Sequence, residues 1–204
     1  MAGGLLMYRL LRTAFLASLL FVFAGCAGRD FVRPSSDAVK LGQTTYSQIV
    51  QHMGEPRRIS DVTKNGKSMK SISYSYAATG GEPLEEGVIP ARTVAFFFFK
   101  DVLVGQRFIS SFRSDNSNFD DTKINGILKG KTSRFEVIQI LGKPSASFIP
   151  PMVKECSGEA IGYGYQTTRG DVYSGYKYFG KFMTLSFDDR DIVSDIDYSS
   201  SGNN

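Results

Sequence analysis

The chain has 204 residues, of which 42% are hydrophobic and 13% aromatic, and its formal net charge is +4. That length allows one large or two small domains with a packed core, while the weak charge excludes the dense basic patch of a nucleic-acid binder. The chain holds one histidine and two cysteines, so it cannot supply the roughly four His and Cys ligands of a structural zinc site. A Ser-His-Asp catalytic triad or a Cys-His catalytic dyad would depend on His52, which we expect on a helix surface. We therefore expect no catalytic residue, no metal and no small-molecule cofactor.

Residues 1–25 have the layout of a secretory signal peptide. Arg9 and Arg12 form a basic n-region, and an apolar h-region and small residues follow before Cys26. The alternative is a membrane-spanning helix, which needs about 20 apolar residues. The uncharged run at 13–28 has only 16 residues, so we favour the signal peptide.

The end of this leader, FAGC at 23–26, resembles the lipobox of bacterial lipoproteins, although Phe23 stands where Leu is usual. The resemblance implies cleavage before Cys26 and acylation of that cysteine, with palmitate as one of the acyl chains. Two or three acyl chains hold a protein stably on a membrane, because each buried methylene contributes about 0.8 kcal/mol. Ala27 after the cysteine favours outer-membrane sorting in the rule known for enteric lipoproteins. We therefore expect a lipid-anchored, periplasm-facing protein of the bacterial outer membrane.

Changes in composition divide the rest of the chain, beginning with a short polar segment after the lipid site. If Cys26 is lipidated, Cys156 has no partner within the chain, and we expect either a buried thiol or pairing between chains. The predicted parts are a tether at 26–40, a first repeat at 41–112, a connector at 113–127, a second repeat at 128–199 and a disordered tail at 200–204.

A helix signature occurs twice, as GQTTYSQIVQHMGEP at 42–56 and GKTSRFEVIQILGKP at 130–144, an offset of 88 residues from Gly42 to Gly130. Thr45 and Ser133 each stand three residues before Gln or Glu, which predicts a capping box. Apolar residues at spacing i, i+1, i+4 predict one buried stripe. Gly followed by Pro two residues later predicts the helix end.

Segments with period two follow each helix and predict antiparallel strands. Asn65-Gly66 adds a hairpin turn in the first copy. The matching strand segments are 72–76 with 161–165, 95–99 with 183–187, and 106–112 with 191–198. We therefore predict an α+β fold of two tandem units, each a helix with a three-stranded antiparallel sheet, with or without an extra edge strand.

Both helix signatures resemble the G-x-T-T-x-x-x-V-x-x-x-(L/M)-G-x-P pattern of the SmpA/OmlA (BamE-like) lipoprotein domain family. The Tyr-x-Tyr strand and the closing Phe-Asp strand also fit, so the resemblance covers about 41–112 and 128–199. The tandem arrangement is similar to that of the β-lactamase inhibitor proteins, whose two units form one curved sheet surface. The resemblance implies an envelope lipoprotein without catalytic residues, and it carries over one residue, Cys26, as the lipid site.

Aromatic residues in the predicted strands provide the candidate partner face. Where the second copy alternates apolar and polar residues at 183–187, the first copy has Phe96 and Phe98 at the polar positions, so that strand should be covered on both faces. The cover is either the other unit or a partner protein. The tyrosines of the Tyr-x-Tyr strands form either the core or an open binding face, because tyrosine is enriched at interfaces. The candidate partner-binding residues are Phe96, Phe98, Tyr74, Tyr76, Tyr163 and Tyr165.

We expect a non-enzymatic outer-membrane lipoprotein that acts as a protein-binding or scaffold module in envelope assembly. Its expected partners are the membrane, through the lipid on Cys26, and another envelope protein, with no nucleic acid. The alternative is an inhibitor-like module that blocks an envelope enzyme. The Tyr- and Gly-rich segment at 170–180 is either an adaptable contact segment or a flexible connection.

Overall fold

The computed structural model describes residues 28–202, apart from 36, 79 and 155–157. The predicted leader at 1–25, the predicted lipid site Cys26 and the thiol Cys156 lie outside the described residues. Residues 28–35 and 37–40, predicted as part of the tether, lie against the folded body, and Val39 is 3% exposed.

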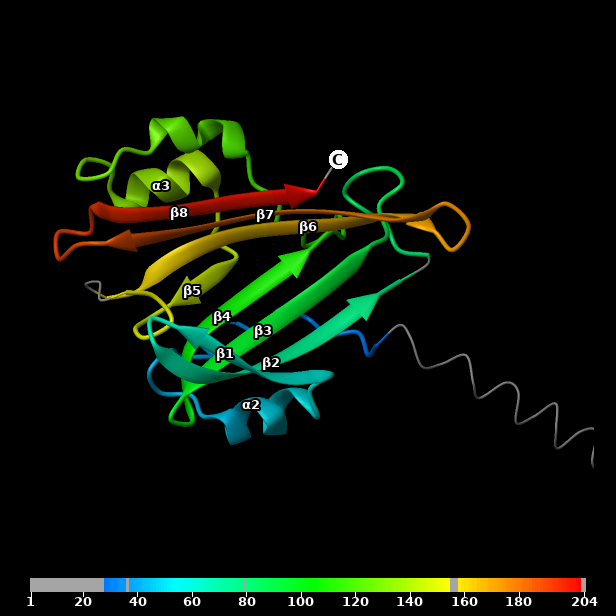
Figure 1. Ribbon diagram of the computed structural model, residues 1–204, viewed down its shortest axis with the longest axis horizontal. Helices are drawn as coiled ribbons and strands as arrows, with labels where there is room; N and C mark the ends of the chain where they lie inside the picture. The colour runs from blue at the N-terminus through cyan, green and yellow to red at the C-terminus, as the bar shows by residue number, and fades with distance from the viewer. Residues whose placement is uncertain (1–27, 36, 79, 155–157, 203–204) are drawn as a thin grey trace, which may run out of the picture.

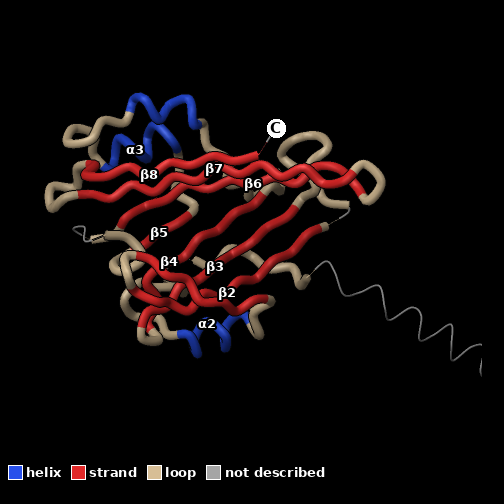
Figure 2. Tube along the Cα trace, in the orientation of Figure 1, coloured by secondary structure: helices blue, strands red, loops and turns tan. Residues whose placement is uncertain are grey.

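One antiparallel sheet of eight strands dominates the described chain (Figures 1 and 2), and its strands are paired in sequence order. The strands are β1 (Arg58–Lys64), β2 (Lys67–Ala77), β3 (Ala91–Phe99), β4 (Val102–Ser110), β5 (Ala146–Phe148), β6 (Ala160–Asp171), β7 (Gly175–Phe187) and β8 (Val193–Gly202). The last strand therefore extends into the segment predicted as a disordered tail.

The prediction of an α+β fold built from two tandem helix-plus-three-stranded units is wrong. The described chain is mostly β, and all eight strands belong to one curled sheet. The join is β5, which pairs with β4 through Gly105↔Phe148 and Arg107↔Ala146, and with β6 on its other side. Short connections favour pairing of successive strands, but an alternating pattern does not show where a sheet ends. A run of three residues such as β5 is also too short to predict a strand from its period.

Two short α-helices, α2 (Tyr46–Met53) and α3 (Arg134–Leu141), begin and end as the repeated signature predicts. A capping box opens each helix, with Thr45 at the start of α2 and Ser133 at the start of α3. Gly54 and Gly142 end the helices at φ of 81° and 82°, a backbone conformation that glycine adopts readily. A 3₁₀ helix, η2 (Asp121–Gly126), lies in the predicted connector.

A buried tyrosine ties each α-helix to the sheet in the same way. The Tyr74 hydroxyl donates to the carbonyl of Gly54 over 2.8 Å, and the Tyr163 hydroxyl donates to the carbonyl of Gly142 over 2.9 Å. Burial raises the pKa of Tyr74 to about 12 and also raises the pKa of Tyr163, so both phenols stay protonated as donors. The sequence repeat is therefore a repeat of helix, cap and anchoring tyrosine within one sheet.

The curl of the sheet separates an outer face from an inner face. In Figure 1, α3 lies beyond β8 and α2 lies beyond β1 and β2, so both helices cover the outer face. Outer-face side chains form one cluster under each helix, around Phe96 under α2 and around Leu185 under α3. A third cluster lies on the inner face and joins Phe97 of β3 to Phe148 of β5, with ring centroids 6.3 Å apart. The inner face is therefore where the two halves of the chain meet.

Candidate functional site

The six aromatic residues of the predicted partner face do not gather on an exposed surface. Tyr76 is half-buried, and the other five are buried: Phe96, Phe98, Tyr74, Tyr163 and Tyr165. Phe96 and Phe98 are 0% and 2% exposed in the cluster beside α2, and Tyr46 packs edge-on against Phe98. The cover over these phenylalanines is thus the helix of their own half, and the structure places the set in the core.

A groove of about 830 Å³ lies on the inner face, between the two halves of the curled sheet. The β1–β2 turn borders it with Lys64 and Asn65, and the segment after β5 borders it with Met152. The Asn65 side chain donates to the carbonyl of Pro151 over 3.0 Å, which holds these two borders together. The remaining lining comes from Arg107 of β4 and from polar residues of β7 and β8.

Arg107 is the most unusual side chain in this groove. Its guanidinium carbon lies 5.2 Å from the ring centroid of Phe182 and 6.0 Å from that of Phe97. Within the described residues, no carboxylate lies within ion-pair distance of Arg107, and its side chain makes no hydrogen bond. Burial lowers the pKa of Arg107, but an arginine remains charged at neutral pH. A half-buried cation without a counterion is costly, so this position favours an anionic ligand.

Hydroxyl groups line the groove on the same face of β7 as the ring of Phe182. Thr184 and Ser186 of β7 point away from the buried residues Met183 and Leu185, as the predicted alternation at 183–187 requires. On β8, Asp197 pairs in register with Thr184. These groups can donate to or accept from the backbone of a bound chain. The groove therefore combines a half-buried cation without a counterion among the described residues, aromatic side chains and hydrogen-bonding side chains.

Charge at the rim of the groove is mixed. Asp195 on β8 accepts from Lys129 over 2.7 Å, and this hydrogen bond lowers the pKa of Asp195. Lys64 and Lys154 also line the groove and are exposed. The groove therefore has two exposed lysines besides Arg107, while Asp195 pairs with Lys129 and the exposed Asp197 makes no ion pair with a described residue.

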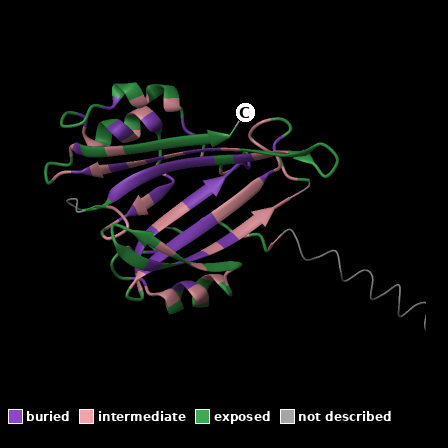
Figure 3. Ribbon diagram, viewed as in Figure 1, coloured by how far each residue is buried: buried purple, intermediate pink, exposed green. Residues whose placement is uncertain are grey.

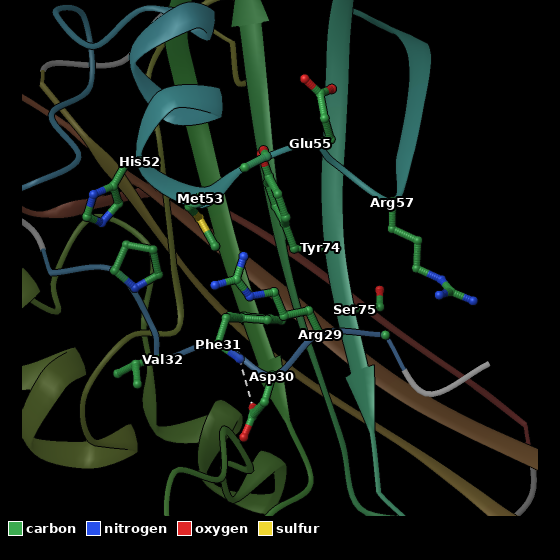
Figure 4. A pocket seen from close by; sticks show the side chains of 13 residues that line it. Arg29, Asp30, Phe31, Val32, His52, Met53, Glu55, Arg57, Tyr74 and Ser75 are labelled. Carbon is green, nitrogen blue, oxygen red and sulfur yellow. Dashed lines mark hydrogen bonds between the residues drawn. The ribbon is translucent and has the colours of Figure 1, made fainter. Parts of the chain in front are cut away.

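A second hollow of about 450 Å³ lies between segment 28–34, the end of α2 and β2 (Figure 4). His52 is exposed at one side of this hollow and Arg57 lies at the other, with Tyr74 between them. Among the residues that the structure describes, the His52 side chain makes no hydrogen bond to a serine or a carboxylate. The N-terminal segment itself forms one wall of this hollow, and its Phe31 amide donates to Asp30 Oδ1 over 2.8 Å.

Two arginines fasten that N-terminal segment to the body. Arg92 Nη1 of β3 donates to the carbonyl of Phe31 over 3.0 Å. Arg33 Nη2 donates to the carbonyl of Pro144 over 2.9 Å, and its guanidinium lies 5.4 Å from the ring centroid of Phe108. The N-terminal segment is therefore fixed as one wall of this hollow, and we take the inner-face groove as the candidate site.

The part of the chain that the structure describes contains no cluster of three or more His, Cys, Asp or Glu side chains that could hold a metal ion. In the same residues, no helix has the length and apolarity to cross a membrane.

Comparisons with known protein families, curated proteins and solved structures found no match to this chain. The predicted membership of the SmpA/OmlA (BamE-like) family in tandem duplicate is therefore wrong. No family match supports it, and the eight strands form one sheet in place of tandem helix-plus-three-stranded units. The short helix signature repeats a cap and a glycine stop, which many helices share for the same physical reasons.

Residue patterns in the sequence do not single out Arg107. Its strand, VLVGQRFIS, is apolar apart from Gln106, Arg107 and Ser110. The face of the sheet to which each of these side chains points depends on the register shift in the pairing of β3 and β4 between Phe97 and Phe98. That shift places Gly105, and not Val104, opposite Phe97. A lone arginine in an otherwise apolar strand is the available sequence signal, and it does not reveal whether a carboxylate faces it.

Proposed function

We propose that this protein is a non-enzymatic, lipid-anchored binding module of the bacterial envelope, which holds an acidic segment of another envelope protein in the inner-face groove. The observation that carries the proposal is Arg107, a half-buried guanidinium that faces the groove without a counterion among the described residues. A carboxylate in the groove would supply that counterion through a bidentate, charge-assisted hydrogen bond.

The lining of the groove supports a polypeptide ligand. Phe182 and Phe148 offer apolar contact, and Met152 adds a flexible side chain that adapts to different shapes. Thr184 and Ser186 supply hydroxyls along β7, where a bound backbone has amides and carbonyls to satisfy. This mixture of apolar walls and a few polar groups is typical of ligand-binding pockets.

The lipid anchor supports the envelope location. The leader at 1–25 and the FAGC sequence ending at Cys26 have the features of a lipoprotein signal. Two or more acyl chains would keep the groove at a membrane surface, where the local concentration of other envelope proteins is high. Attachment to the outer membrane, facing the periplasm, is part of the proposal.

Selection of displayed random peptides against the protein tests the binding role. We expect the selected peptides to contain Asp or Glu and to bind at least tenfold more weakly to Arg107→Gln, because that variant lacks the charge that a carboxylate would pair with. The matched control is Arg190→Gln, which removes the same charge from an exposed arginine that pairs with Asp188 outside the groove. Selected peptides that lack acidic residues, or that bind both variants equally, would contradict the proposal.

A further inference from the structure

We propose that the tip of the β6–β7 hairpin is a second membrane contact, which rests in the lipid headgroup layer beside the acylated Cys26. The tip comprises residues 172–178. The inference rests on the lipid anchor of the proposed function, and it assigns a surface that the groove does not use. Three features carry it: the reach of the anchor, the end of the body that the anchor meets, and the chemistry of the hairpin tip.

The first feature is the short distance between the anchor and the body. Gly28 packs so closely on β2 that a Cβ atom there would lie 2.1 Å from the carbonyl oxygen of Ser75. Figure 4 shows Arg29 beside Ser75, with the segment passing on to Phe31. Two residue steps separate Cys26 from Gly28, and two extended residues span at most about 7 Å. An acylated Cys26 would therefore hold this end of the body against the bilayer, with no room for a long spacer.

The second feature is the position of the hairpin tip at the same end of the molecule. In an antiparallel sheet of sequential order, β2 and β6 run in the same direction, so their C-terminal ends share one end of the sheet. The loop after β2 reaches β6, because Ile89 donates its amide to the carbonyl of Thr168 over 2.8 Å and Val88 bridges to Arg169. Figure 1 shows the blue start of the described chain and the orange hairpin at the right-hand end of the molecule.

The third feature is the composition of the tip. Tyr173 is 97% exposed and Val172 is 76% exposed, and Tyr176 and Tyr178 follow on β7 with Lys177 between them. Figure 3 shows this hairpin end as exposed. Tyrosine places an apolar ring and a polar hydroxyl at the boundary of lipid and water, and lysine reaches the headgroups from a buried stem. This composition suits a membrane interface better than bulk water.

The tip is also ordered enough to present these rings. The Asp171 carboxylate accepts from the amides of Tyr173 and Ser174, each over 2.8 Å. These bonds lower the pKa of Asp171, so the turn keeps its carboxylate acceptor at neutral pH. The tip lines neither of the two hollows described above, so contact with lipid leaves the groove open to a partner.

Single-tryptophan reporters test this contact, because the chain has no tryptophan of its own. The full lipidated protein carrying Tyr173→Trp is reconstituted into phosphatidylethanolamine–phosphatidylglycerol vesicles with brominated acyl chains. We expect a blue-shifted emission and at least a twofold loss of intensity relative to vesicles without bromine. Tyr178→Trp serves as a second reporter in case the first variant folds poorly.

The matched control is Phe135→Trp, at a position that is 69% exposed on α3. This control lies at the opposite end, since the neighbouring Arg134 pairs with Asp191 in the β7–β8 turn. We expect its emission to be unchanged by bromine. If the protein floats with the vesicles but neither hairpin reporter is quenched, the hairpin contact is wrong and the anchor stands. If the protein does not float, both the anchor and the hairpin contact are wrong.

Discussion

At the scale of single residues, the candidate site depends on a cation that the fold leaves without a counterion. Arg107 contacts the rings of Phe97 and Phe182, but its guanidinium makes no ion pair with a described residue. Arg92, another half-buried arginine, differs because it lies 3.3 Å from Asp115. If Arg107 serves binding, its side chain should contribute little to the free energy of unfolding, whereas an arginine that holds the fold together should contribute several kcal/mol.

The first prediction concerns the stability of Arg107→Met. We expect a free energy of unfolding within about 1 kcal/mol of the wild-type value, because the loss of two cation–π contacts is offset by relief of the unpaired charge. Chemical denaturation followed by circular dichroism measures it. A loss of several kcal/mol would show that Arg107 is a structural residue.

The second prediction concerns acid stability and Asp121. This carboxylate accepts from Lys181 Nζ over 2.8 Å and from the Tyr198 hydroxyl over 2.7 Å, and these hydrogen bonds lower its pKa. A lowered folded-state pKa means that the stabilisation is present above the ordinary value of 3.8 and is lost as the pH falls through the folded-state value.

Asp121→Asn should therefore lower the free energy of unfolding by about 1–2 kcal/mol at pH 7. The charged Lys181 ammonium then loses its ion pair and keeps the carbonyl of Phe119 as its hydrogen-bond acceptor, while solvent screens part of the lost interaction. The difference from wild type should shrink as the pH falls below the ordinary pKa of an aspartate. Urea unfolding at several pH values measures both effects, and a difference that does not vary with pH would contradict the assignment.

At the scale of elements, the sequence predicts best where one local rule decides the structure. Both capping boxes and both glycine stops are confirmed, and Asn65 and Gly66 form the predicted turn with φ of 50° and 72° between β1 and β2. The segment 170–180, predicted as either an adaptable contact segment or a flexible connection, is a hairpin whose turn joins the paired ends of β6 and β7. It pairs as the outer part of β6 and β7, through contacts such as Gly170↔Tyr176 that are set by the partner strand.

The third prediction belongs to the repeated helices. Ser133→Ala and Thr45→Ala should each cost about 1 kcal/mol, because each removes the side-chain acceptor for a helix N-terminal amide. Thermal unfolding of the two variants beside wild type measures the loss. A change in one helix but not the other would contradict the equivalence of the two caps.

At the scale of the whole molecule, the single sheet makes the two halves depend on each other. The inner-face cluster draws residues from both halves of the chain: Met69, Ala95, Phe97 and Val104 from the first, and Ala146, Phe148 and Ala160 from the second. This joining could not be predicted from the sequence, because it depends on the three residues of β5 and on contacts across the curl. The groove and the face of Arg107 follow from the same join, which is why residue patterns did not reveal them.

The fourth prediction tests that dependence with Phe148→Ala. Removing this 6%-exposed ring should cost about 3–5 kcal/mol and leave a cavity between the halves. Hydrogen exchange should show faster opening of both β3 and β7, since both belong to one sheet. Faster exchange confined to β5–β8 would show that the halves are independently stable.

Photocrosslinking in cells tests the central claim most directly. A benzophenone amino acid replaces Thr184, whose side chain lines the groove, and the captured segment is identified by mass spectrometry. We expect a crosslink to an acidic segment of an envelope protein, which disappears with Arg107→Gln and persists with Arg190→Gln. A crosslink that persists with Arg107→Gln, or one to a segment without acidic residues, would contradict the binding of an acidic segment by Arg107.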